Sequence, residues 1–234
     1  MAVNRIILNE TSYFGAGARR MLADEFRGRG YVRAFVVTDK DLIRFGVAGK
    51  VTGVLDEAGI AYEIFSDLKP NPTVKNVQAG VEAFRRSGAD AIVAIGGGSA
   101  MDTAKAVGII AANPAFGDVV LLEGMAPTAN RSVPVFALPT TPGTAAEVTI
   151  NYVITDEANT KKMVCVDPKD IPAVAIIDAE LMAAMPRRLT AATGMDALSH
   201  AIEGYITKGA WTLTDMFELK AVELIARWLP AAVE

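Results

Sequence analysis

The stretch AIVAIGGGSAMDTAKA, residues 91–106, is the most informative part of the sequence, because it predicts a buried strand, a glycine-rich turn and a helix in succession. The run AIVAI contains no polar residue, which is typical of a strand that other elements cover on both faces. Gly96, Gly97 and Gly98 then leave the backbone N–H groups open to a ligand, and the start of the next helix adds partial positive charge. The stretch therefore predicts a cradle for a pyrophosphate group.

Two side chains of this stretch are candidate ligand contacts. Ser99 can cap the helix or donate to a phosphate oxygen, and Asp102 falls in the first turns of the helix. The spacing differs from the GxGxxG fingerprint, and the Lys-Ser/Thr pair of a Walker A loop is missing after the glycines. A tight turn packed closely on its neighbours would explain the same residues, so that alternative stays open.

Short β-rich runs alternate with segments of helical period through most of the chain. We expect strands at Arg33–Thr38, Tyr62–Phe65, Ala91–Ile95, Val135–Leu138, Thr149–Thr155 and Val174–Ile177. We expect helices over Asp41–Ala58, Val74–Ser87 and Asp102–Ala112, and Asn71-Pro72 suits a helix start with Asn71 as N-cap. This alternation predicts an α/β fold, a Rossmann-like parallel sheet with helices on both faces.

Two other strand ends are candidate ligand contacts. The loop Pro139–Thr144 (PTTPGT) brings the hydroxyls of Thr140, Thr141 and Thr144 to the carboxyl end of a strand, where open α/β sheets bind ligands. Asp39 ends another strand, where a carboxylate can accept from ribose hydroxyls; a helix N-cap or a solvated residue is the simpler explanation. The early turn Gly15–Gly17 lacks a preceding apolar strand, and we interpret it as structural.

The character of the chain changes after Ile177. Leu189–Thr207 and Leu213–Leu229 are helical in period, no further strand is indicated, and Pro230 is expected to end the second helix. We therefore expect a nucleotide-binding α/β domain over residues 1–184 and the first helices of an all-α domain over residues 185–234. Two helices alone leave their apolar faces uncovered, so we expect this second domain to be incomplete and the chain to be truncated.

Asp196 and His200 are a candidate metal-binding pair. Their i, i+4 spacing places a carboxylate and the chain's single histidine on one face of a helix, where together they can hold a divalent metal. A solvated polar face would explain the same spacing, because catalytic metal sites usually take at least three protein ligands.

Composition narrows the functional classes. The net charge of −4 disfavours nucleic acid and anionic membrane surfaces as partners, and no apolar run is long enough to span a bilayer. The single cysteine, Cys165, lies in an apolar stretch, which favours a buried thiol in a reducing compartment. Because the N-terminus has no secretory pattern, we expect a cytoplasmic protein.

Three motifs in fixed order resemble one family. GGGSAMDTAKA, LPTTPGTAAEVT and GMDALSHAIEGYIT occur in this order, with NYVITDE and KMVCVDP between the last two. Together they closely resemble the iron-containing, group III alcohol dehydrogenases, which have a dehydroquinate synthase-like fold. The opening NRIILNETSYFGAGA and the end HAIEGYITKGAWTLTD are similar to the lactaldehyde-reducing members. The resemblance extends over essentially the whole chain.

The resemblance implies a cofactor, a metal and their contacts. It implies NAD held by Asp39, Asn71, Gly97, Gly98, Ser99, Asp102, Thr140, Thr141, Thr144, Thr149, Asn151 and Lys162. It implies ferrous iron with Asp196 and His200 as two of four ligands; the family's two further histidines have no counterpart, because His200 is the only histidine. It also implies a homodimer that pairs through the apolar segment Arg5–Leu8.

The implied activity is oxidation and reduction of a small alcohol and aldehyde. Iron would stabilise the alkoxide and NAD would accept hydride, interconverting 1,2-propanediol and lactaldehyde. Three alternatives remain: an NAD-binding chain without catalysis, a zinc enzyme similar to glycerol dehydrogenase or dehydroquinate synthase, and a purely structural role.

Overall fold

The structure is a computed structural model that describes residues 3–234. The chain divides into two compact units. The sheet unit comprises the residues up to Thr140 together with Ala146–Leu181, and the helical unit comprises Thr141–Ala145 and Met182–Glu234. The roles expected for residues 1–184 and 185–234, nucleotide binding and metal binding, stay predictions.

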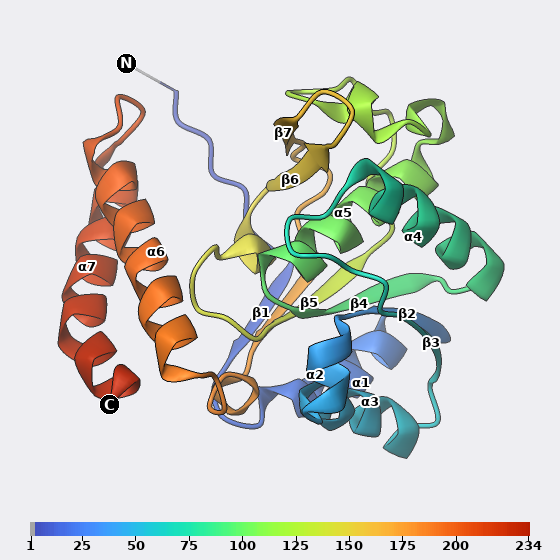
Figure 1. Cartoon of the computed structure of the whole chain (residues 1–234), viewed down its shortest axis with the longest axis horizontal. Coiled ribbons are helices and arrows are strands. Elements are labelled where there is room, and N and C mark those ends of the chain that lie inside the picture. Colours follow the sequence, from blue (N-terminus) through green and yellow to red (C-terminus); the bar gives the residue numbers. More distant parts are fainter. Residues whose placement is uncertain (1–2) are drawn as a thin grey trace. The chain divides into compact units, whose positions relative to one another are not determined.

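The sheet unit is built on six parallel strands in the order β1-β8-β5-β4-β2-β3 (Figure 1). Their bounds are β1 Thr11–Phe14, β2 Arg33–Val37, β3 Ala61–Phe65, β4 Ala91–Gly96, β5 Val135–Pro139 and β8 Val174–Ile177. All residues of β4 and β5 are buried, as the uninterrupted apolar runs predict. The expected parallel sheet is confirmed.

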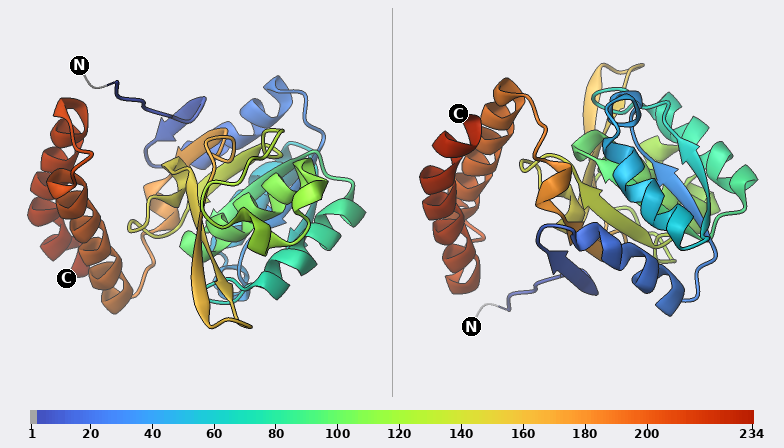
Figure 2. Two further views of the ribbon diagram at one scale, coloured as in Figure 1. Left: turned by 90° about the horizontal axis from the view of Figure 1, so that it is seen from above. Right: turned by 90° about the horizontal axis from the view of Figure 1, so that it is seen from below.

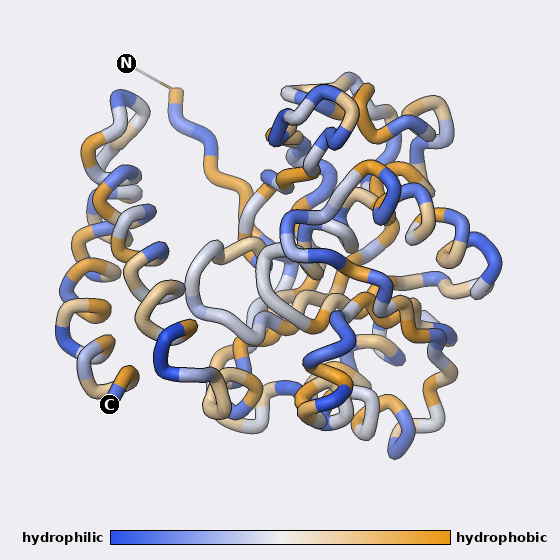
Figure 3. The backbone as a smooth tube through the Cα atoms, viewed as in Figure 1, coloured by the Kyte–Doolittle hydropathy of each residue, from blue (hydrophilic) through white to orange (hydrophobic). Residues whose placement is uncertain are grey.

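Helices cover both faces of this sheet, and a separate apolar core fills each side. On one face, Phe35 and Val37 of β2 pack with α4 and α5; on the other, Val36 packs with α1 and α3. The bounds are α1 Met21–Gly28, α2 Lys40–Arg44, α3 Val47–Glu57, α4 Val74–Ser87 and α5 Gly98–Ala112. The described residues of this unit also form short 3-10 helices at Ala18–Arg20, Pro114–Phe116, Val119–Leu122, Ala146–Val148 and Ala179–Leu181. Figure 3 shows hydrophobic residues concentrated along the central strands.

Several helix boundaries differ from expectation; the helix expected over Asp102–Ala112, for instance, begins four residues earlier, at Gly98. The single helix expected over Asp41–Ala58 is two helices, because Gly46 adopts a left-handed conformation with φ 74° that interrupts the helical hydrogen bonds. Asn71 is not the N-cap of α4: Thr73 is, and it shares a capping box with Asn76. Asn71 instead has φ 56°, a left-handed conformation that asparagine tolerates better than most residues.

A two-stranded antiparallel hairpin lies outside the parallel sheet. It pairs β6 (Asn151–Asp156) with β7 (Lys161–Val166), so the strand expected at Thr149–Thr155 starts two residues later. The hairpin is anchored inward by Tyr152, Ile154, Met163 and Cys165, all at most 1% exposed. The expectation that Cys165 is a buried thiol is confirmed.

The N-terminal end of the described chain adds an edge strand. The sequence did not indicate β1, because TSYF is half polar, but it pairs in parallel with β8. Residues 3–9 form no strand, and the side chains of Ile6 and Leu8 are exposed. The homodimer expected to form through Arg5–Leu8 stays a prediction.

The helical unit pairs α6 (Arg187–Ile206) with α7 (Thr212–Val233), which lie side by side in both views of Figure 2. Pro230 does not end α7: the helix continues to Val233, because a proline near the last turn removes only one of the final hydrogen bonds. Met216, Phe217 and Trp228 are 64%, 63% and 57% exposed, as expected for two helices without further partners. None of the helices in residues 3–234 is long and apolar enough to cross a membrane.

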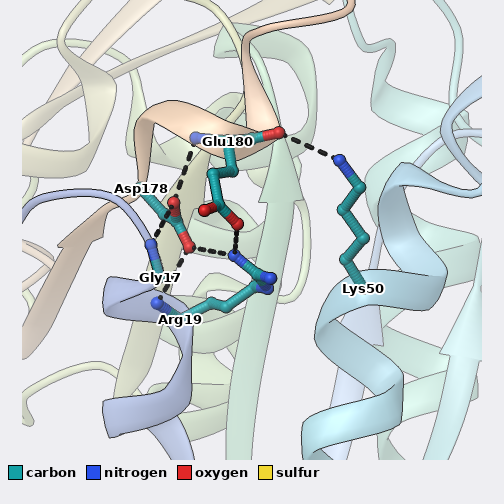
Figure 4. Close-up of polar contacts among 5 residues, drawn as sticks. All are labelled: Gly17, Arg19, Lys50, Asp178 and Glu180. Carbon is teal, nitrogen blue, oxygen red and sulfur yellow. Dashed lines mark hydrogen bonds and ion pairs between the residues drawn. The ribbon is translucent and has the colours of Figure 1, made fainter.

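A buried carboxylate ties the Gly15–Gly17 turn to the end of β8 (Figure 4). Asp178 is fully buried and accepts from the backbone N–H of Gly17, from the backbone and guanidinium of Arg19, and from the backbone N–H of Glu180. Burial opposes ionisation, but Arg19 and the N–H donors outweigh it and lower the pKa of Asp178. Lys50 of α3 donates to the Glu180 carbonyl and adds a third element. The turn is structural, as interpreted from the sequence.

Replacing Asp178 should test this junction. We expect Asp178→Ala to lower the free energy of unfolding by about 3 kcal/mol at neutral pH, because the backbone N–H groups of Gly17, Arg19 and Glu180 lose their acceptor and the Arg19 guanidinium keeps only Glu180. The lowered pKa means that the contribution is present above the unfolded-state pKa and is lost as the pH falls, so the difference should shrink in acid. Urea unfolding at several pH values measures it. Asp41→Ala, which breaks the exposed pair with Arg44, is the control and should change far less; equal effects would contradict the assignment.

Candidate functional site

The turn between β4 and α5 has the geometry of an anion cradle. Gly97 is the N-cap of α5, and no side chain of the described residues caps this helix end. Residues 97–99 are partly exposed, although the strand before them and most of the helix after them are buried. Ser99 therefore lies inside the first turn and is not the N-cap. A 15-residue helix whose first residues are partly exposed and which has no side-chain cap is suited to bind a phosphate.

Two further candidate residues meet this turn. The backbone N–H of Asn71 donates to Ser99 Oγ at 3.3 Å, and Lys162 Nζ of β7 donates to Asn71 Oδ1 at 2.9 Å. Thr155 of β6 also donates to the Pro72 carbonyl, which fixes the Asn71 segment against the hairpin. Asn71, Ser99 and Lys162, from three separate elements, are thus brought together at one end of α5. The arrangement offers a positive charge and polar groups to an anion.

Asp102 lies in the first turns of α5, as the sequence predicts. Its Oδ2 accepts from the backbone N–H of Val153 at 3.1 Å, so it faces the hairpin from the second turn of α5. Burial raises the pKa of Asp102 to about 6, while Lys105 and the Val153 N–H lower it. The carboxylate is a structural acceptor in this arrangement, and its contact with a cofactor stays a prediction.

Lys105 is a functional candidate that the sequence motifs did not reveal. It is completely buried, and its ammonium donates to the carbonyls of Thr149 and Asn151 and to Thr149 Oγ1 at 2.7, 2.9 and 3.0 Å. Burial lowers its pKa to about 8, and the carboxyl groups of Asp170, Asp102 and Glu147 oppose that shift. The signal was a single lysine in the otherwise apolar helix AKAVGIIAA, since a lysine there must find buried acceptors.

The remaining candidates of the sheet unit occupy three places. Thr140 is buried at the end of β5, and its N–H donates to the Gly96 carbonyl beside the glycine turn. Thr149 and Asn151 are the acceptors of Lys105 at the start of β6. Asp39 is the N-cap of α2 and accepts from the Leu42 N–H at 2.8 Å, as one of the two explanations of its position predicts.

The helical unit holds the other candidates. Asp196 Oδ1 and His200 Nε2 are 3.9 Å apart on α6, and both side chains are about half exposed. The loop with Thr141 and Thr144 lies beside them: a Cβ added to Gly143 would meet Asp196 Oδ2 at 3.0 Å. Within residues 3–234, no group of three or more histidine, cysteine, aspartate or glutamate side chains could hold a metal. Asp196 and His200 can thus supply two ligands, which is half of a typical site.

Family models match both units. Residues 9–179 match the model of the iron-containing alcohol dehydrogenases, and residues 190–234 match the C-terminal model of the same family. The chain belongs to the iron-containing alcohol dehydrogenase family. The resemblance in motifs is therefore confirmed over nearly the whole sequence, and it is more specific than the glycine turn alone.

Named members of this family are similar along the whole chain. The lactaldehyde reductase of Escherichia coli (strain K12) is 59% identical over 98% of the chain, and the NAD-dependent methanol dehydrogenase of Bacillus methanolicus is 44% identical over 95%. The chain spans 60% and 58% of the length of these two curated relatives.

Solved structures of the family share the fold. A 1,3-propanediol oxidoreductase is 40% identical with a TM-score of 0.95, covering 99% of this chain and 60% of the other. Sulfoacetaldehyde reductase from Bifidobacterium kashiwanohense, solved in complex with NAD+, is 34% identical with a TM-score of 0.90, covering 100% of this chain and 61% of the other.

The raised pKa of Asp102 predicts that ionisation of this carboxyl lowers the free energy of unfolding. A folded-state pKa of about 6, above the ordinary 3.8, means that the folded chain binds the proton of Asp102 more tightly than the unfolded chain does. Protonation of Asp102 therefore stabilises the fold, and this contribution is lost as the pH rises through 6. Asp102→Asn keeps an acceptor for Val153 without the charge. We expect its stability relative to the parent to improve by on the order of 2 kcal/mol between about pH 4 and pH 8, measured by urea unfolding. Glu157→Gln, at an exposed hairpin residue, is the control; a difference independent of pH would contradict the assignment.

Proposed function

We propose that this chain binds NAD through its sheet unit and supplies the cofactor site and half of the metal site of an iron-dependent alcohol dehydrogenase that interconverts lactaldehyde and 1,2-propanediol. The observation that carries the proposal is the uncapped N-terminus of α5, with Asn71, Ser99 and Lys162 gathered beside it. Family membership and the 59% identity to a lactaldehyde reductase support the substrate class.

The residues at the glycine turn fit a dinucleotide. The N–H groups at the start of α5, which no side chain caps, suit a pyrophosphate, and Lys162 supplies a positive charge within reach of the same turn. Gly97 has no side chain to obstruct a close approach of the phosphate. NAD would supply the hydride acceptor, and the residues of this chain would bind and orient it.

The metal part of the proposal rests on fewer groups. Asp196 and His200 present a carboxylate and an imidazole on one helix face, a donor set that suits ferrous iron, which would act as a Lewis acid on the alcohol oxygen. Two ligands do not close a site, because a catalytic metal usually takes at least three from the protein. This shortfall favours a second candidate function, an NAD-binding chain with little or no turnover.

The charge of Asp39 should set the preference between the two nicotinamide cofactors. A carboxylate at the end of β2 would repel the 2′-phosphate of NADP, so NAD should bind better by about tenfold or more. Asp39→Asn removes the charge but retains a side chain that caps α2, whereas Asp39→Gly removes both. Titration of both cofactors into the three proteins measures this. NADP binding should improve in both variants; equal affinities for the parent would contradict the assignment.

Turnover distinguishes the two candidate functions. With ferrous iron added under anaerobic conditions, we expect this chain to bind NAD but to oxidise 1,2-propanediol far below the ~10 s⁻¹ of an ordinary enzyme, because two ligands hold iron weakly. Metal content after dialysis and NADH formation are the measurements, with Asp196→Ala and His200→Ala as controls. Ordinary turnover would show that further ligands reach the metal. Failure to bind NAD would refute both candidates.

A further inference from the structure

Helix α5 carries two charged side chains that turn away from the glycine loop and reach the hairpin β6–β7. Lys105 is completely buried, which is rare for a lysine unless acceptors surround it. Asp102 lies three residues earlier and also faces the hairpin. Neither is explained by anion binding at the start of the helix, so another role is needed.

Both side chains bind along the same edge of β6 and the residues just before it. Lys105 Nζ donates to the carbonyls of Thr149 and Asn151, and Asp102 accepts from the N–H of Val153. The Thr155 N–H, on the next alternate residue, donates to the Pro72 carbonyl at 2.7 Å. Alternate residues of a strand direct their backbone groups to the same side. The edge that faces away from β7 is therefore satisfied by side chains of α5 and by the Asn71 segment.

The three N–H donors of the Lys105 ammonium group each have an acceptor on this side of the hairpin. The third acceptor is Thr149 Oγ1, at 3.0 Å. A two-stranded hairpin is marginally stable by itself, and this one adds no strand to the parallel sheet. Its position on α5 therefore depends on these polar contacts together with its buried apolar face.

The hairpin in turn presents Lys162 to the cofactor site. Lys162 lies on β7 and donates to Asn71, whose N–H donates to Ser99 in the first turn of α5. The same helix thus carries the glycine turn at its start and, one and two turns later, the two side chains that hold the strand pair bearing Lys162. A displaced β6 would carry Lys162 away from the turn.

We propose that Asp102 and Lys105 are positioning residues for the cofactor site, which hold the β6–β7 hairpin so that Lys162 faces the Gly97–Ser99 turn. The inference rests on the proposed NAD binding and deepens it. It reassigns Asp102 from a cofactor contact to an anchor that acts through Val153, and it adds Lys105, which no motif singled out.

A double-mutant cycle with Lys162 tests whether Asp102 affects NAD binding through Lys162. We expect Asp102→Ala to weaken NAD binding about tenfold, and Asp102→Asn, which retains an acceptor for Val153, to recover most of that loss. In a Lys162→Ala background the further loss from Asp102→Ala should fall below about threefold, because the anchor acts through Lys162. A full tenfold loss in that background would overturn the proposal.

Amide hydrogen exchange measures how firmly the hairpin is held, and it does so whether or not the chain binds NAD. Asp102→Ala and Lys105→Met should each speed amide exchange in residues 149–166 without NAD present, while β4 and β5 stay protected. Lys105→Arg, which retains the charge, and Glu157→Gln, at an exposed hairpin residue outside these contacts, should change it least. Unchanged hairpin exchange in Asp102→Ala would overturn the proposal. Faster exchange in a chain that binds no NAD would instead support the anchor and refute the proposed function.

Discussion

Every residue of β4 is buried, and much of the sheet unit follows from covering both faces of this strand. A strand with no solvent-facing side needs neighbours on both edges, which are β2 and β5, and helices above and below. The two apolar cores, one formed with α4 and α5 and the other with α1 and α3, meet that need. Because the six strands of this sheet run parallel, the turn after β4 opens at the carboxyl edge of the sheet, where α/β folds bind their ligands.

The burial of α5 explains why its charged side chains form hydrogen bonds with the neighbouring hairpin. Most of its residues from Ala100 to Ile110 are buried, so a charged side chain on it must find partners within the protein. Lys105 finds three acceptors on β6 and the residues just before it, and Asp102 finds the Val153 N–H. The helix therefore combines an open, uncapped start with a body that holds the neighbouring hairpin. Binding groups and their support are parts of one element, which favours a preorganised site.

In the helical unit, by contrast with the sheet unit, many apolar side chains and both candidate metal ligands are exposed to solvent. α6 and α7 pack on each other, but large apolar side chains such as Phe217 and Trp228 stay more than half exposed. Asp196 and His200 are also about half exposed and have no third metal ligand beside them within the described residues. The candidate residues that are held in place by hydrogen bonds thus lie in the sheet unit. The proposed metal chemistry depends on groups that residues 3–234 do not bring together.

The local and periodic features of this protein can be predicted from its amino-acid sequence. The apolar run AIVAI and the glycines after it predict the buried strand and the anion-binding turn, and the family motifs predict the fold, because these signals lie within a few adjacent residues. The helix boundary at Gly46 and the cap at Thr73 were missed, since they depend on backbone angles that composition does not specify. The contacts among Asn71, Ser99 and Lys162, and those of Asp102 and Lys105 with β6 and the residues before it, become visible only in the folded chain. Those contacts join segments tens of residues apart, so they depend on how the hairpin packs on α5 and are not contained in any single stretch of sequence.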